Sequence, residues 1–282
     1  MTLTGAVDRS TRAFWQVTGR SVDLHGTEFW LRAPVHDGSE VADRWLDAYA
    51  RSLGGTLAEG SPAAGLLPSM SMLDGPGFAS AALRPEVRDF YERTSRWRME
   101  VWTQWNPLLQ PAGELVAAWF GRRVRQLTIP TRPLDVARGM DSRVVQVLDA
   151  DGTQVGAGWL RTLRSTGAYV YSGYYRTTTL PGAARPSVHV SFPLEHGNVQ
   201  VFLQPRVLPG GALGLLSAHG PFGTDGAYVT VAGHSGLRAA RVPLHETFRV
   251  FVDDEGVLRT DHVLRLCRTV AVRLHYRMER VG

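Results

Sequence analysis

The sequence contains no lysine, so all 31 residues in its lysine-plus-arginine count are arginine. This absence excludes every reaction that depends on a lysine amine: the Schiff base to pyridoxal phosphate or a carbonyl substrate, the phosphate-loop lysine, the strand lysine of kinases and the Ser-x-x-Lys nucleophile. Isoleucine is almost missing as well, with Ile129 as the single example. A GC-rich coding sequence explains both gaps, and the chemical exclusions hold whatever the cause.

Cysteine is equally scarce, and Cys267 is the only one. A single cysteine can form neither an internal disulfide nor a cysteine-based zinc site, which favours a cytoplasmic protein. We expect no secretion signal, because Asp8, Arg9 and Arg12 interrupt the start of the chain before an apolar block forms. The longest uncharged stretch, residues 207–224, contains two prolines and five glycines, so no integral membrane segment is expected.

Positive charge is concentrated in the second half of the chain. The net charge is +5; residues 131–282 hold 17 arginines and 12 acidic residues, whereas residues 1–130 hold 14 of each. A nucleic-acid surface combines clustered cations with aromatic side chains on one face, and only residues 259–280 approach that pattern. We therefore expect no nucleic-acid partner.

Aromatic composition divides the chain into two regions. Seven of the eight tryptophans precede residue 125, whereas six of the eight tyrosines and seven of the nine histidines follow it. We predict an N-terminal, mainly helical segment over residues 1–128, after an irregular or strand-like start at residues 14–31. An antiparallel β domain follows over residues 129–282. One continuous core across both regions is the alternative.

Three helices are predicted in the N-terminal region. The first runs from an N-cap at Ser39 to Gly54, a residue suited to a left-handed C-cap. The second covers residues 85–106, where a proline opens the helix, apolar side chains recur at helical spacing and Pro107 ends it. The third covers residues 111–127, and arginines at its end complement the helix dipole.

The second region changes to the two-residue period of β-strands. Acidic residues next to glycine predict hairpin turns at residues 149–152 and 253–256, where short carboxylates bond local backbone. Consecutive strands with frequent turn signals indicate an antiparallel barrel or sandwich. The predicted fold class is α+β: a C-terminal antiparallel β-barrel or β-sandwich of about nine or ten strands, covered by the N-terminal helical segment. We predict strands at residues 145–147, 153–163, 168–179, 188–192, 199–207, 213–217, 227–231, 247–252, 257–266 and 270–278.

The end of the chain separates apolar from charged side chains most clearly. Apolar residues occupy the even-numbered positions from Leu264 to Met278, with only Arg268 breaking the row. Odd-numbered positions carry Arg265, Arg273, His275 and Arg277. This alternation predicts one core face and one cationic face. The cationic row is read as solvated, with a carboxylate or phosphate ligand as the alternative. Residues 260–267 also fit a helical stripe, so a helix there stays an alternative to the strand.

Three short motifs each lack an essential residue. Residues 245–249 (His-Glu-Thr-Phe-Arg) end in arginine where a zinc-binding helix needs its second histidine. Residues 233–237 (Gly-His-Ser-Gly-Leu) lack the closing glycine of a nucleophile elbow. Residues 156–161 place arginine where a dinucleotide-binding turn needs a small residue. We expect neither a metal nor a cofactor.

Tyrosine and histidine provide the candidates for chemistry. His189 stands between Val188 and Val190; if the valines pack between sheet and helices, its imidazole faces the barrel interior or solvent. An interior histidine beside tyrosines can act as an acid or base near neutral pH. Four tyrosines occupy both faces of one predicted strand, so some of their phenols must point into the barrel: Tyr169, Tyr171, Tyr174 and Tyr175.

Two dipeptides combine histidine with an acid, His245-Glu246 and Asp261-His262. Consecutive strand residues point to opposite faces, so the members of each dipeptide cannot pair with one another. Any histidine–carboxylate dyad must therefore form across strands.

These features predict a site for a bulky apolar molecule, of lipid-, terpenoid- or polyketide-like type, in a β-barrel cavity. The Gly/Pro-rich loop at residues 54–84 and the tryptophan-rich helices are available to cover its mouth. If His189, Tyr171 and His245 are catalytic, the protein is a cofactor-independent cyclase or isomerase; otherwise it is a carrier. The predicted ligand contacts are Tyr169, Tyr174, Tyr175, Trp159, Phe192, Phe202 and Arg176.

A peripheral membrane or protein-interaction role is the remaining hypothesis. Residues 111–127 combine an apolar helical face with three arginines, and such a helix can lie on an anionic membrane surface. Vesicle sedimentation with Trp119→Glu tests it: unchanged binding, or none in the parent, removes the hypothesis.

Overall fold

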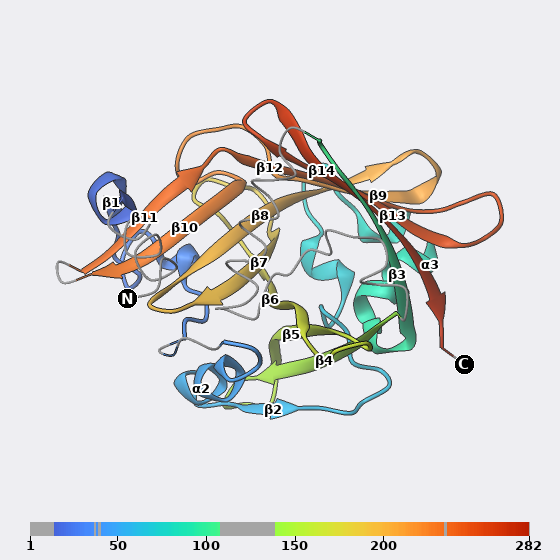
Figure 1. Cartoon of the computed structure of the whole chain (residues 1–282), viewed down its shortest axis with the longest axis horizontal. Helices are drawn as coiled ribbons and strands as arrows, with labels where there is room; N and C mark the ends of the chain where they lie inside the picture. The colour runs from blue at the N-terminus through green and yellow to red at the C-terminus, as the bar shows by residue number, and fades with distance from the viewer. Residues whose placement is uncertain (1–13, 37, 39–40, 108–138, 234–235, 282) are drawn as a thin grey trace.

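The computed structural model describes residues 14–36, 38, 41–107, 139–233 and 236–281. In this part of the chain the protein is mostly β. Eleven strands form one antiparallel sheet in the order β2-β4-β5-β6-β7-β8-β9-β12-β13-β14-β3 (Figure 1). Most neighbours in the sheet are also neighbours in sequence. The antiparallel sheet predicted for the C-terminal region is therefore confirmed.

The strands of the second region match the predicted ones closely. All ten predicted strands overlap a strand of the structure, residues 258–266 are strand rather than helix, and β11 is an unpredicted addition. The bounds are β4 (Met140–Leu148), β5 (Gln154–Leu163), β6 (Tyr169–Thr178), β7 (Ser187–Leu194), β8 (Gly197–Leu208), β9 (Ala212–Leu216), β10 (Gly226–Gly233), β11 (Gly236–Val242), β12 (Leu244–Val252), β13 (Leu258–Leu266) and β14 (Thr269–Arg280).

The long strand β8 divides the sheet. Its first half, up to Phe202, pairs with β10, and its second half, from Gln204, pairs with β9. β10 continues to β11 and then to β1 (Arg20–Ser21), which forms a side branch of the main sheet. The indole of Trp30 packs on this branch, with its ring 5.0 Å from that of Tyr228.

The sheet is not closed into a barrel, so the closed form of the prediction is wrong. It ends at β2 (Thr56–Ala58) on one side and at β3 (Trp97–Trp105) on the other. Closure needs pairing between the end strands, and among the described residues β3 pairs only with β14. The exposed Arg98 and Glu100 of β3 are typical of an edge strand. The predicted domain boundary at residues 128–129 lies outside the described residues.

The helix predicted over residues 85–106 is wrong beyond its first two turns. α3 (Pro85–Glu92) begins at its proline as expected, and a 3-10 turn, η4 (Thr94–Arg96), follows it. From Trp97 the chain is strand: every second residue up to Val101 is buried, and the strand pairs with β14 along its whole length. Long-range pairing of aromatic and β-branched residues thus overrides a spacing that also suited a helix.

The first predicted helix is confirmed over a shorter range, α2 (Trp45–Ser52). Its predicted N-cap, Ser39, lies outside the described residues. Gly54 follows the last turn with φ of 67°, the left-handed conformation expected of a terminating glycine. The indole N–H of Trp45 donates to the Ser172 hydroxyl at 2.9 Å, which fixes α2 on the outer face of β6.

Both predicted hairpin turns use an aspartate to organise their backbone. Asp149 accepts two backbone N–H bonds between β4 and β5, and Asp253 does the same between β12 and β13. Gly152 and Gly256 follow with φ of 76° and 78°. The acidic clusters are therefore turns, as predicted. Gly233 and Gly236, from the segment rejected as a nucleophile elbow, are paired at the ends of the antiparallel strands β10 and β11, and residues 234–235 lie outside the described residues.

Packing layers lie on both faces of the curved sheet (Figure 1). Inside the curve, α3 and the segment with η2 (Met70–Leu73) pack against inward side chains of β3, β5, β7, β8 and β12 to β14. Outside it, α2 and the Trp30 segment cover separate parts of the sheet. None of the described helices is both long and apolar enough to cross a membrane. The predicted helix at residues 111–127 lies outside the described residues.

Candidate functional site

A cavity of about 210 Å³ lies inside the curve of the sheet. Strands β5 to β8 form one wall, strands β12 to β14 and β3 form the opposite wall, and α3 contributes Phe90 and Tyr91. A mainly apolar cavity with a few convergent polar groups has the composition of a small-molecule site. The polar side chains among its described lining residues are Tyr91, Arg161, Tyr171, Tyr175, Glu246, Thr260, His262 and Tyr276.

Aromatic rings form the wall on the β5 and β6 side. Trp159 lies edge-to-face with Tyr171 and Tyr175, at centroid distances of 5.4 and 5.6 Å, and Tyr171 meets Phe192 at 5.2 Å. Such pairs hold one another in fixed orientations beyond the effect of burial alone. The structure thus brings together four residues that the sequence analysis selected. Their role in contacting a ligand stays a prediction.

Arg161 places a positive charge in this wall without a carboxylate partner among the described residues. Only 6% of the residue is exposed. Its guanidinium lies 5.3 Å from the ring centroid of Trp159, 5.6 Å from that of Tyr171 and 5.4 Å from that of Tyr276. Nη2 reaches only the sulfur of Met140, at 3.8 Å, and Nε has no hydrogen-bond partner. Cation–π contacts do not replace the hydrogen bonds that a buried guanidinium has lost.

The phenols beside Arg161 stay protonated and so can serve as hydrogen-bond donors. Burial raises the pKa of Tyr171 well above its ordinary value and also raises the pKa of Tyr175 and Tyr276, although the charge of Arg161 opposes the rise in each case. All three therefore keep their protons at neutral pH. The Tyr171 hydroxyl is buried and has no hydrogen-bond partner in the described part of the chain.

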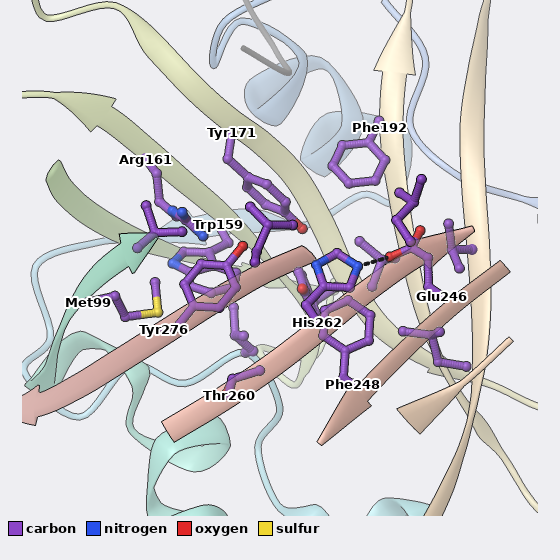
Figure 2. Close-up of a pocket in the computed structure, with 18 of the residues that line it drawn as sticks. Met99, Trp159, Arg161, Tyr171, Phe192, Glu246, Phe248, Thr260, His262 and Tyr276 are labelled. Carbon is purple, nitrogen blue, oxygen red and sulfur yellow. Dashed lines mark hydrogen bonds and ion pairs between the residues drawn. The ribbon is translucent and has the colours of Figure 1, made fainter. Parts of the chain in front are cut away.

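Glu246 and His262 form a cross-strand dyad at the other side of the cavity. His262 Nε2 lies 2.9 Å from Glu246 Oε2, and the ring of Phe248 stacks on the imidazole at 3.8 Å. A carboxylate accepts, so Nε2 carries the hydrogen, and in the neutral imidazole Nδ1 then has the free lone pair. Nδ1 has no hydrogen-bond partner. Figure 2 shows the imidazole between Glu246 and the phenol rings of Tyr171 and Tyr276.

Four of the predicted ligand contacts lie on the outer face of the sheet instead. Tyr174 packs under α2, Phe202 packs against Trp30, and Arg176 donates to backbone carbonyls of the Trp30 segment. Tyr169 also packs with the residues around α2 on the outer face. A register shift at the start of β6 turns its side chain away from the face that carries Tyr171. The tyrosines do load both faces of β6, as predicted, but only two of the four reach the cavity.

His189 also lies on the outer face, so the interior position considered for it is wrong. Val188 and Val190 point inward, which turns the imidazole outward. His189 is fully buried there: Nδ1 accepts from Arg176 Nε at 2.9 Å, and Nε2 donates to Gln200 Oε1 at 2.8 Å. Burial and the charge of Arg176 hold the pKa of His189 well below its ordinary value, so the ring is neutral at physiological pH.

This buried neutral histidine predicts acid sensitivity. Below pH 6.5 the unfolded chain takes up a proton at His189 while the folded chain does not, so the free energy of unfolding falls by up to about 1.4 kcal/mol per pH unit. His189→Asn is expected to be less stable than the parent at pH 7.5. Between pH 6.5 and 5.5 its free energy of unfolding should fall less steeply with decreasing pH, because the contribution of His189 is missing. Urea titrations at a series of pH values measure both. The exposed-site control His196→Asn should keep the parent slope; equal slopes in all three proteins contradict the assignment.

His245, the third predicted catalytic residue, does not line the cavity either. It follows Leu244 and precedes Glu246, both of which point inward, so its ring faces the other way. The ring lies 3.5 Å from that of His219, and burial together with His219 lowers the pKa of His245. Of the three residues predicted as catalytic, only Tyr171 borders the cavity.

Six polar residues of the cavity were not selected from the sequence: Tyr91, Arg161, Glu246, Thr260, His262 and Tyr276. The sequence did contain a signal for Glu246 and His262. Each belongs to a dipeptide of histidine and an acid, and such dipeptides can form a histidine–carboxylate dyad only across strands. The β12–β13 register places Phe248 opposite His262, which brings Glu246 within reach on the same face. Tyr276 stands in the even-numbered row predicted to face the core. Arg161 follows Trp159 by two residues and so shares its face.

The odd-numbered row of β14 faces outward, as predicted. Arg273 is exposed, Arg277 pairs with Glu279, and His275 forms a second cross-strand dyad with Asp261 at 2.8 Å. This outer dyad has the same chemistry as the cavity dyad and no contact with the cavity, which makes it a matched control.

In the described part of the chain no three His, Cys, Asp or Glu side chains come together as a metal site would require. Comparison of the chain with protein-family models, with curated proteins and with solved structures gave no match. The functional argument therefore depends on the geometry of the cavity.

Proposed function

We propose that this protein binds a small apolar molecule in the cavity inside its sheet. The observation that carries the proposal is a cavity of about 210 Å³ whose lining is mainly apolar and aromatic. An apolar cavity of about 150 Å³ in another protein stays dry and takes up benzene. The larger space here suits a ligand of two fused rings, which narrows the predicted lipid-, terpenoid- or polyketide-like classes to their smaller members.

Titration with 2-naphthol tests this proposal directly. Trp159 stands in the wall, so a bound naphthalene ring changes the tryptophan fluorescence of the protein. We expect saturable binding of one molecule per chain. Mass spectrometry of organic extracts from the purified protein would then identify a natural ligand. Absence of saturable binding by 2-naphthol, 2-naphthoate and 2-naphthamide alike contradicts the proposal.

The Glu246–His262 dyad favours a second candidate, proton transfer on the bound molecule. The free Nδ1 of His262 can accept a proton from a carbon next to a carbonyl, while Glu246 holds the imidazole in orientation. A protonated phenol such as Tyr276 can donate to the enolate oxygen that develops. Return of the same proton to another carbon completes an isomerisation without any cofactor.

Hydrogen exchange into 2-tetralone in heavy water measures this activity. The parent protein is expected to accelerate deuteration next to the carbonyl, and His262→Gln to slow it by about 100-fold or more, the usual contribution of a general base. Glu246→Gln should give a smaller loss, because it removes orientation but keeps the imidazole. Proton NMR follows the exchange.

His275→Gln is the matched control, because it alters the same kind of dyad outside the cavity. It should exchange 2-tetralone at the parent rate. If the parent exchanges 2-tetralone no faster than His262→Gln does, the proposed proton transfer is excluded, and the proposal that the cavity binds an apolar molecule is unaffected. The protein is then a carrier, as the sequence analysis also allowed. A peripheral membrane role for residues 111–127 stays a separate prediction.

A further inference from the structure

We infer that the cavity selects molecules carrying a carboxylate, and that Arg161 binds it. The inference rests on the proposed function, since it specifies which apolar molecule the cavity accepts. It makes Arg161 a specificity-determining residue.

Arg161 has the properties of a preformed anion site. It is buried, it lines the cavity, and its Nε has no hydrogen-bond partner. Taking a charge out of water is the main cost of a buried ion pair. Here the fold has already desolvated the arginine, so an incoming carboxylate loses only its own hydration. The planar guanidinium then offers two parallel N–H donors to the two carboxylate oxygens.

The described residues provide no carboxylate partner for this charge. Glu246 is the only acidic residue among the described residues of the lining, and it pairs with His262. Asp141, on the neighbouring strand β4, pairs with Arg164 at 2.7 Å.

A second arginine, which is partly buried, has a structural role in this chain. Arg176, on the outer face of β6, donates to the Trp30 and Arg32 carbonyl oxygens and to His189. Its guanidinium is thus bonded on several sides. Arg161, on the adjacent strand, has no hydrogen bond to a backbone carbonyl in the described part of the chain: its guanidinium meets the Tyr276 side chain and the Met140 sulfur, and Nε has no partner.

The surroundings of Arg161 complete a site for an amphiphilic ligand. The rings of Tyr171 and Tyr276 both lie beside its guanidinium, and both residues keep their hydroxyl protons, so a phenol can donate to the same carboxylate. Figure 2 shows Arg161 and Phe192 at opposite sides of Tyr171. The carboxylate therefore lies at the Arg161 end, and the rings extend along the aromatic wall.

Binding of 2-naphthoate and of 2-naphthamide tests the inference, because the two molecules match in shape and differ in charge. We expect the parent to bind 2-naphthoate at least about tenfold more tightly, since hydrogen bonds to charged groups are the stronger ones. Arg161→Met should remove this preference and keep the affinity for 2-naphthamide. Arg161→Gln provides the same comparison with a polar side chain, and retained 2-naphthamide binding shows that a variant is folded. Isothermal titration calorimetry gives both affinities.

The outcomes separate this inference from the proposed function. Equal binding of the two molecules by the parent, or an unchanged preference in Arg161→Met and Arg161→Gln, overturns the carboxylate site and leaves the apolar cavity intact. Failure of both molecules and of 2-naphthol to bind the parent overturns the proposed function itself.

Discussion

Val190→Phe is expected to abolish ligand binding while leaving the protein at least as stable as the parent. Val190 is buried on β7 and borders the cavity, so a phenyl ring at this position extends into empty space. Filling a cavity commonly adds about 0.5–2 kcal/mol to the free energy of unfolding. The same ring occupies the space of the ligand, and we expect the affinity for 2-naphthoate to fall by at least about 100-fold, or about 2.7 kcal/mol.

Val188→Phe is the matched control for this change. Val188 lies two residues away on the same face of β7, is fully buried and does not border the cavity. Overpacking a filled core costs about 1–3 kcal/mol, so this variant should lose stability. Thermal unfolding and naphthoate titration of both variants give the comparison. Equal destabilisation by the two substitutions would mean that the space beside Val190 is already filled.

Arg161→Met is expected to stabilise the ligand-free protein. Three cation–π contacts at 5.3 to 5.6 Å are close to the outer limit of such contacts and contribute about 0.5–1 kcal/mol each. An unpaired buried charge costs several kcal/mol, so desolvation outweighs these contacts. Methionine fills a similar volume without charge. We expect the free energy of unfolding to rise by about 1–3 kcal/mol and the Tm by about 2–6 °C.

Arg176→Met should act in the opposite direction. Its guanidinium donates to His189 and to two backbone carbonyls, and its removal takes three charge-assisted hydrogen bonds from the folded protein. Each such loss costs about 1–3 kcal/mol. Differential scanning calorimetry of the two variants measures the contrast. A loss of stability in Arg161→Met as large as in Arg176→Met would show that Arg161 is a structural residue, and the carboxylate site would lose its physical basis.

Much of the sheet could be predicted from the sequence because its signals are local. Asp149 and Asp253 organise hairpin turns with the backbone that follows them, and the alternation from Leu264 to Met278 specifies which side chains face inward. Residues 97–105 were mistaken for helix because tryptophans and valine at three- and four-residue spacing fit either structure. Their strand conformation depends on β14, which lies more than 160 residues further along the chain.

The open form of the sheet and the identity of its faces are also long-range properties. A two-residue period shows that Val188 and Val190 oppose His189, but it does not show which side is the interior. Which face becomes the interior depends on α2 and the Trp30 segment, because these two elements cover the outer face. His189 lies on that outer face and is buried beneath this cover. The cavity residues depend likewise on register: Glu246 and His262 meet because β12 and β13 pair as they do.

The central claim is an apolar cavity that holds an aromatic carboxylate by Arg161. The most direct measurement is a crystal structure with 6-bromo-2-naphthoate, in which anomalous scattering locates the bromine atom. The account predicts bromine inside the curve of the sheet, with both carboxylate oxygens within hydrogen-bond distance of the Arg161 guanidinium. Bromine only on the surface, or an interior occupied by the protein's own side chains, would contradict it.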